Sequence, residues 1–267
     1  MPEIEINGVR LHYVEQGTGP EVVVFSHSYL LDWSHFKPQM HALSERYRCI
    51  AFDHRGHGGS EKPKDGYDME TLYADAVAFI EAMDSAPVHF VGLSTGGFIG
   101  LRLGFRRPDL LRTLTLMDTS AEVEPALKKF QYKMMLAMVG VIGTRPFAGY
   151  IMSLFFSKSS PSDPSRQTEL ARFRKLMVEN DKHAIIRFGH GIFDRTGVLD
   201  SVGQITVPTL VIAGEQDTSQ PPARAQQITD RIPNSKLLIV PNAAHISNVD
   251  DPATVNAALE KHLARHE

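Results

Sequence analysis

The sequence predicts an α/β protein in which a mostly parallel sheet of about eight strands is covered by helices on both faces. Short apolar runs alternate with stretches of helical periodicity along most of the chain. Most of the runs contain no polar residue, as strands that are buried on both faces require. The chain has 267 residues, of which 42% are hydrophobic and 22% charged. This composition is typical of a globular protein with one sizeable core.

The strands are expected at the apolar runs. Residues 4–13 alternate around Asn7-Gly8, a dipeptide that favours a tight turn between two antiparallel strands. Further strands are expected at residues 22–25, 49–52, 88–91, 114–117, 210–213 and 237–240. Together with the N-terminal hairpin, these runs give the sheet of about eight strands.

Helices are expected where apolar residues recur every three or four positions between the strands. Residues 72–83 have such a face, and so do the stretch after Gly96 and the tail from about Pro252 to Arg265. Each of these helices would place one apolar face against the sheet.

The alternation of strands and helices breaks once, after the sixth expected strand. Helical patterns rich in Met, Leu and Phe continue there without a strand, divided by a Ser- and Pro-rich loop at 157–165. We therefore expect an α/β core made of residues 1–120 and 196–267, with a helical cap inserted at 121–195.

Composition argues against several classes of partner. The formal net charge is −3, so there is no basic excess to attract nucleic acid or an anionic membrane. Cys49 is the only cysteine, which excludes an intrachain disulfide, and its apolar neighbours predict a buried thiol. No apolar stretch reaches the roughly 18 residues of a spanning helix, and the first residues lack the pattern of a signal peptide. We expect a cytoplasmic protein.

The clearest chemical motif follows the expected strand at 88–91. Residues 92–96 read Gly-Leu-Ser-Thr-Gly and lead into a helical pattern, a G-x-S-x-G sequence at a strand-to-helix turn. Such a turn is sharp, needs glycine on both sides, and exposes the serine hydroxyl. It also places the N–H of Thr95 at a helix N-terminus, where an oxyanion is stabilised. The motif predicts Ser94 as nucleophile and Thr95 as an oxyanion donor.

A serine nucleophile needs a neighbouring base, which is in turn oriented by an acid. Asp217 follows the expected strand at 210–213, and His245 follows the one at 237–240. The carboxyl ends of parallel strands meet at one edge of a sheet, so the two side chains are expected beside Ser94. The sequence therefore predicts a triad of Ser94, His245 and Asp217.

Other residues compete for these roles. Glu215 lies beside Asp217, and Asp118 follows the sixth expected strand, so either could supply the acid. Three other histidines also lie in loops at strand ends: His27, His54 and His57. His54 and His57 have no evident third ligand nearby, so neither a metal site nor a cofactor is expected. Their loop is expected to stabilise the base of the site instead.

The motif at 92–96, the Asp-x-Arg-Gly-x-Gly-x-Ser stretch at 53–60 and the two downstream strand ends resemble the α/β-hydrolase superfamily. The resemblance covers almost the whole chain outside the expected cap, and it implies the α/β-hydrolase fold. In many members a His-Gly pair after the third strand precedes the second oxyanion donor. Here Ser28 replaces that glycine, so Tyr29 inherits the donor role.

Within the superfamily, two short matches look most like the 3-oxoadipate enol-lactonases. One is Ser26-His27-Ser28 with Asp32 following, and the other is His-Ile-Ser-Asn beginning at His245. The Ser-Thr-Gly-Gly sequence that begins at Ser94 also resembles the cofactor-free haloperoxidases and perhydrolase esterases. A serine at this position argues against haloalkane dehalogenases and epoxide hydrolases, which need a carboxylate nucleophile.

The resemblance implies an enzyme that cleaves a small-molecule ester or lactone. A carbon–carbon bond hydrolase or a perhydrolase would use the same triad, and a small-molecule receptor on this fold is a further alternative. An unshifted histidine near pKa 6.5 predicts that activity falls below about pH 6. The acyl and alcohol parts of the substrate stay open, and so does the oligomeric state, a homo-oligomer included.

Overall fold

The computed structural model describes residues 2–264, and within them eight strands form one sheet in the order β1-β2-β4-β3-β5-β6-β7-β8. The strands are β1 (Glu3–Ile6), β2 (Val9–Gln16), β3 (Val22–Ser26), β4 (Arg48–Phe52), β5 (Val88–Leu93), β6 (Leu111–Met117), β7 (Thr209–Gly214) and β8 (Ser235–Val240). The pairs β1–β2 and β2–β4 are antiparallel, and all later pairs are parallel. The predicted sheet is confirmed, including its N-terminal hairpin.

Successive residues of the central strands face two separate cores. In β3, Val22 and Val24 belong to the core on one face of the sheet, whereas Val23 and Phe25 belong to the core on the other. Because side chains alternate along a strand, a strand covered on both faces must be apolar throughout. This explains the unbroken apolar runs in the sequence. Cys49 lies in one of these cores as a buried free thiol, as predicted.

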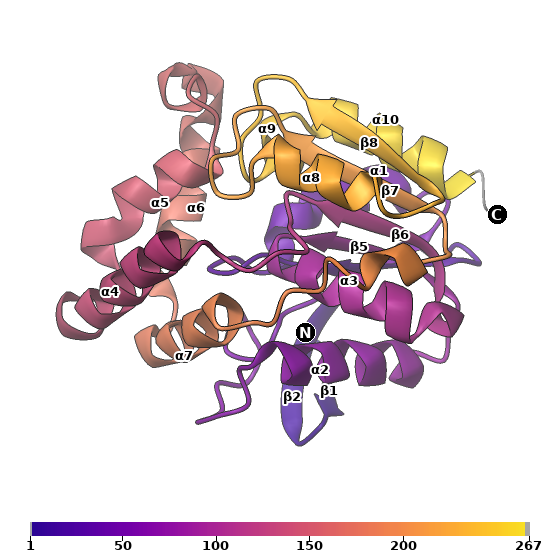
Figure 1. Cartoon of the computed structure of the whole chain (residues 1–267), viewed down its shortest axis with the longest axis horizontal. Coiled ribbons are helices and arrows are strands. Elements are labelled where there is room, and N and C mark those ends of the chain that lie inside the picture. Colours follow the sequence, from indigo (N-terminus) through magenta and orange to yellow (C-terminus); the bar gives the residue numbers. More distant parts are fainter. Residues whose placement is uncertain (1, 265–267) are drawn as a thin grey trace.

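Helices cover both faces of the sheet. The helices on one face are α2 (Met69–Ala82), α3 (Thr95–Arg106) and α8 (Pro222–Thr229), and those on the other are α1 (Lys37–Leu43), α9 (Ser247–Asp250) and α10 (Pro252–Leu263). Figure 1 shows α2 and α3 side by side along the sheet. The three helices expected from periodicity are confirmed, although Arg265, the expected end of the last one, lies outside the described residues. The helices α1, α8 and α9 were not predicted, because they are too short to establish a periodic pattern.

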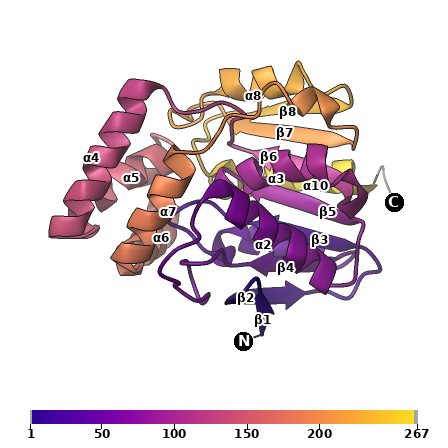
Figure 2. The same ribbon diagram turned by 60° about the horizontal axis from the view of Figure 1, so that its bottom comes forward.

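Between β6 and β7 the described chain forms helices and no strand, as predicted. The α-helices are α4 (Ala126–Ile142), α5 (Ala148–Phe155), α6 (Gln167–Glu179) and α7 (Lys182–Phe193). They gather at one end of the sheet, apart from the helices that cover its faces (Figures 1 and 2), with α4 packed on α7 and α5 on α6. The loop expected at 157–165 contains one short turn of 3₁₀ helix, and another begins at its end. Within residues 2–264, no helix is long and apolar enough to cross a membrane.

Candidate active site

Ser94 occupies the sharp turn between β5 and α3. Its φ of 52° lies in the left-handed region that non-glycine residues rarely adopt. Its N–H donates to the carbonyl of Met117 at 2.8 Å, which fixes the turn to the neighbouring strand. A Cβ atom at Gly92 would collide with the carbonyl of Gly96, and one at Gly96 with the carbonyl of Ser26. Both glycines of the motif are therefore required by the close approach of backbone segments.

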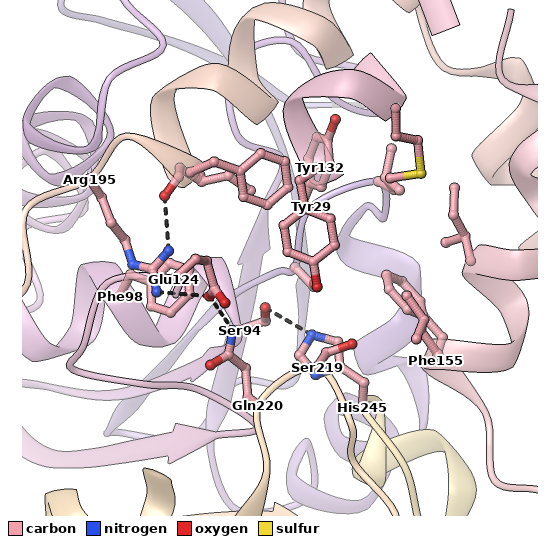
Figure 3. A pocket seen from close by; sticks show the side chains of 17 residues that line it. Tyr29, Ser94, Phe98, Glu124, Tyr132, Phe155, Arg195, Ser219, Gln220 and His245 are labelled. Carbon is pink, nitrogen blue, oxygen red and sulfur yellow. Dashed lines mark hydrogen bonds and ion pairs between the residues drawn. The ribbon is translucent and has the colours of Figure 1, made fainter. Parts of the chain in front are cut away.

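The three residues predicted as a triad lie together. His245 Nδ1 is 2.7 Å from Asp217 Oδ2, and His245 Nε2 is 3.0 Å from Ser94 Oγ. Figure 3 shows the contact between His245 and Ser94 at the wall of a pocket. The carboxylate of Asp217 accepts a hydrogen bond from the N–H at Nδ1, so Nε2 is left as the acceptor for the serine hydroxyl. This arrangement allows His245 to remove the proton of Ser94.

Asp217 is itself held in place by backbone donors. Its Oδ1 accepts hydrogen bonds from the N–H groups of Ser219 at 2.7 Å and Gln220 at 2.9 Å. The second oxygen is thereby directed at His245. Such a fixed carboxylate orients the imidazole and stabilises its charged form.

The competing acids have other partners. Asp118 Oδ1 accepts from the N–H of Gly214 at 2.8 Å, and its Oδ2 accepts from the N–H and hydroxyl of Ser247 at 3.0 and 2.7 Å. Burial, followed by the negative charge of Asp217, raises the pKa of Asp118 to about 7. Glu215 is exposed and accepts from the N–H of Asn242 at 3.0 Å. Among the described residues, the acid hydrogen-bonded to His245 is Asp217.

The pKa of His245 changes the pH dependence expected from the sequence. Burial lowers this pKa, but the charge and hydrogen bond of Asp217, with the charge of Asp118 behind it, more than offset burial. The pKa of His245 therefore lies above its ordinary value of 6.5. The expectation of an unshifted histidine does not hold, and loss of the free base begins at higher pH than the sequence indicated.

The two predicted oxyanion donors, Tyr29 and Thr95, come from two different segments next to Ser94. Thr95 begins α3, and Tyr29 lies in the loop after β3 and lines the pocket together with Ser94. Within residues 2–264, neither backbone N–H donates to a protein acceptor. The N–H of Gly96 donates to the carbonyl of His27 at 3.2 Å, which connects the Tyr29 loop to the serine turn.

The three other histidines at strand ends, His27, His54 and His57, stabilise the loop that contains Tyr29. His27 Nδ1 donates to the carbonyl of Ser28 at 2.7 Å, and its Nε2 accepts from the N–H of His54 at 2.8 Å. His57 Nε2 accepts from the N–H of Leu30 at 3.2 Å. Burial lowers the pKa of His27, His54 and His57, so the rings stay neutral and can both donate and accept. They fix the peptide groups on both sides of Tyr29.

The loop at 53–60 is held by charged contacts that are almost inaccessible to solvent. Arg55 forms a bidentate pair with Asp75, at 2.6 and 2.8 Å. Asp53 accepts from the N–H groups of Trp33 and Gly59 and from His12 Nδ1. These contacts agree with the structural role expected for the loop. In the described part of the chain, no three His, Cys, Asp or Glu side chains are arranged as a metal site.

The pocket beside Ser94 is mainly apolar, and much of its lining comes from helices between β6 and β7. The apolar and aromatic residues from that segment are Tyr132, Met135, Ile151, Leu154, Phe155, Ile192 and Phe193. The same lining includes a hydrogen-bonded polar cluster, formed by Glu124, Arg195 and Gln220. None of the three was predicted from the sequence, because no local motif marks them and only the folded chain brings them together.

Comparison with known proteins agrees with this geometry. Residues 21–252 match the protein family described as "alpha/beta hydrolase fold". The chain is 26% identical to 3-oxoadipate enol-lactonase 2 of Acinetobacter baylyi, over 96% of this chain and 94% of that protein. It is 29% identical to a Mycobacterium tuberculosis protein provisionally named non-heme bromoperoxidase BpoC, over 96% of this chain and 98% of that protein.

A solved structure extends the comparison to three dimensions. The enol-lactonase from Burkholderia xenovorans LB400 superposes with a TM-score of 0.91 at 27% identity, covering 98% of this chain and 100% of that chain. The strand order, the serine turn and the family match over most of the sequence lead to one conclusion. The chain belongs to the alpha/beta hydrolase fold family.

Proposed function

We propose that this hydrolase cleaves carboxylic esters or lactones of small molecules through an acyl-enzyme on Ser94. The observation that carries the proposal is the hydrogen-bond chain from Asp217 through His245 to Ser94 at the wall of a mainly apolar pocket. Nucleophile, base and orienting acid have the mutual geometry that acyl transfer requires.

In the first step, Ser94 Oγ attacks the carbonyl carbon while His245 Nε2 takes its proton. The carbonyl oxygen becomes an oxyanion, which the N–H groups of Tyr29 and Thr95 stabilise. The tetrahedral intermediate then collapses and breaks the bond to the alcohol oxygen. His245 returns the proton to that oxygen, which leaves as the free alcohol, or remains attached as a hydroxyl when the substrate is a lactone.

In the second step, His245 removes a proton from water, which attacks the acyl-enzyme. Collapse of the second intermediate releases the acid and returns the proton to Ser94. In this proposal the core, residues 1–120 and 196–267, supplies the triad, and the cap at 121–195 shapes the pocket. The mechanism requires no metal ion or cofactor.

The relatives named as enol-lactonases support the choice of ester or lactone chemistry. The relative named for a bromoperoxidase supports a second candidate, perhydrolysis, in which hydrogen peroxide replaces water in the second step. Both reactions share the same acyl-enzyme. They differ only in the nucleophile that releases the acyl group.

Initial rates on p-nitrophenyl esters of increasing acyl length, and on enol- and γ-lactones, test the proposal. The wild type should turn over many equivalents, and Ser94→Ala should lose this turnover. Adding hydrogen peroxide and measuring peracid distinguishes perhydrolysis from hydrolysis. Turnover that persists in Ser94→Ala would refute the proposal, and a single equivalent of product would indicate a receptor instead of a catalyst.

A further inference from the structure

Glu124 lies shortly after β6 and lines the same pocket as Ser94 and His245. The residue is only 4% exposed. Its Oε1 accepts hydrogen bonds from Gln220 Nε2 at 2.9 Å, Arg195 Nη2 at 3.2 Å and Arg224 Nη1 at 3.3 Å. Figure 3 shows Glu124, Arg195 and Gln220 together on one side of Ser94, with Phe155 on the other side.

The groups around Glu124 are fixed by further contacts. Arg195 lies 3.8 Å from the ring centre of Phe98, and its Nη1 donates to the carbonyl of Ile192 at 2.9 Å. Arg224 Nη1 also donates to the amide oxygen of Gln220 at 2.7 Å, which turns the amide nitrogen of Gln220 toward the carboxylate. The cluster is therefore preorganised, as a binding subsite requires.

The second oxygen of Glu124, Oε2, is buried and has no hydrogen-bond partner among the described residues. Burial raises the pKa of Glu124, but the hydrogen bond of Gln220 and the charges of Arg195, Arg224 and Lys128 outweigh it and lower the pKa below its ordinary value. The group is thus an ionised carboxylate at neutral pH. Buried carboxylate oxygens generally have a donor, and the three protein donors all bind Oε1.

We propose that Glu124 Oε2 accepts a hydrogen bond from the substrate, which assigns the enzyme to esters or lactones that carry a hydroxyl or amide N–H group. This inference rests on the proposed function and specifies the substrate class of the same site. A substrate with a purely alkyl acyl chain would fill the apolar part of the pocket and leave Oε2 without a donor. A substrate that also carries a donor group would fill the apolar part of the pocket and donate a hydrogen bond to Oε2.

The cations around Glu124 raise the alternative that an anionic substrate binds here. The terminal nitrogens of Arg195 already donate to carbonyls of Ile192 and Glu122 and to Glu124 itself. Lys128 Nζ donates to the carbonyls of Thr218 and Ser219 at 3.1 and 2.9 Å. The unpartnered Oε2 would also repel a carboxylate. The arrangement favours a neutral donor over an anion.

The test compares kcat/KM for matched substrates with the full-length wild type. Ethyl butyrate is paired with ethyl 3-hydroxybutyrate and ethyl 4-hydroxybutyrate, and γ-butyrolactone with α-hydroxy-γ-butyrolactone. The anionic probe is monoethyl succinate. We expect at least one hydroxylated member to exceed its parent by about 10- to 100-fold, the range for a hydrogen bond to a charged group.

Glu124→Gln should bring that ratio close to one, because the amide presents N–H groups where the carboxylate presents an acceptor. Glu122→Gln is the matched control, since Glu122 pairs with the same Arg224 at 3.9 Å but does not line the pocket. Its ratio should equal that of the wild type. If Glu124→Gln does not fold, the wild-type ratios alone decide the question.

Ratios close to one for every wild-type pair, or a preference for monoethyl succinate, would overturn the subsite. Failure of the subsite is distinguishable from failure of the proposed function. In the first case the parent esters are still hydrolysed in a reaction that Ser94→Ala abolishes. In the second case no ester or lactone is turned over through Ser94, and the subsite is refuted with it.

Discussion

His245 Nε2 lies 3.0 Å from Ser94 Oγ, although 151 residues separate the two along the chain. The sheet explains this proximity. Ser94 follows β5 and His245 follows β8, and the parallel order β5-β6-β7-β8 places the C-terminal ends of these strands on one edge. The chain leaves β6 at this edge, and it returns there at Val198, whose N–H donates to the carbonyl of Ala121 at 2.7 Å, so the helices between these two residues can line the pocket.

The decline of kcat/KM at low pH should follow the protonation of His245. Its pKa is raised above 6.5, and the base must be neutral to accept the proton of Ser94. As pH falls through this raised pKa, the imidazole takes up a proton and kcat/KM declines, with a midpoint above pH 6.5. Measurement of kcat/KM on one ester from pH 5 to 9 checks this. A profile that stays flat to pH 5 would count against His245 as the base.

Asp217 and Asp118 should differ sharply in their effect on catalysis. Asp217→Asn would favour the wrong imidazole tautomer, and in the serine protease precedent this change lowers kcat by about 10⁴. Asp118→Asn should cause a much smaller loss, because Asp118 bonds to Gly214 and Ser247 and not to His245. Initial rates at saturating substrate distinguish the two, with thermal melts as a control for folding. Equal losses would indicate that Asp118 shares the role of the acid.

Tyr29 should contribute its backbone and not its hydroxyl. The hydroxyl donates to the carbonyl of Ile185 in α7 at 2.8 Å, so it is already engaged away from the oxyanion position. Tyr29→Phe keeps the N–H, and kcat should change by only a few-fold, with a stability loss of about 0.5–1.5 kcal/mol from the lost hydrogen bond. Steady-state kinetics and urea unfolding measure both. A kcat loss of about 10²–10³, typical of a missing oxyanion donor, would assign that role to the hydroxyl.

The ion pair of Arg55 and Asp75 should dominate the stability of the loop at 53–60. Both side chains are almost fully buried, so Asp75→Ala leaves an uncompensated guanidinium and should lower the free energy of unfolding by about 3–5 kcal/mol. Asp109→Ala is the matched control, because the pair of Asp109 with Arg107 is exposed and contributes about 1 kcal/mol or less. Urea denaturation of both variants compares them. Equal effects would contradict the structural role of the loop.

The sequence predicts the sheet and the triad for a common physical reason. Ser94, Asp217 and His245 each follow a short, mainly apolar run, and runs of this kind become parallel strands whose ends meet. The local pattern is therefore sufficient to locate the three residues at one edge. It also limits the rivals, since Glu215 points to the surface once the strand ends.

The polar part of the pocket could not be predicted in this way. Glu124 and Arg195 lie 71 residues apart, near the two ends of the inserted segment, and neither belongs to a motif. Their pairing depends on how the helices between them pack, which periodicity does not determine. The sequence likewise does not reveal that His27, His54 and His57 are neutral, because their neutral state follows from burial and from hydrogen bonds between separate loops.

The most direct test of the acyl-enzyme on Ser94 is intact-protein mass spectrometry of samples quenched during turnover of p-nitrophenyl acetate. We predict an adduct of one acetyl group that peptide mapping assigns to Ser94, that forms and decays at rates consistent with turnover, and that is absent from Ser94→Ala. Rapid turnover without an adduct, or an adduct on another residue that persists in Ser94→Ala, would contradict the mechanism.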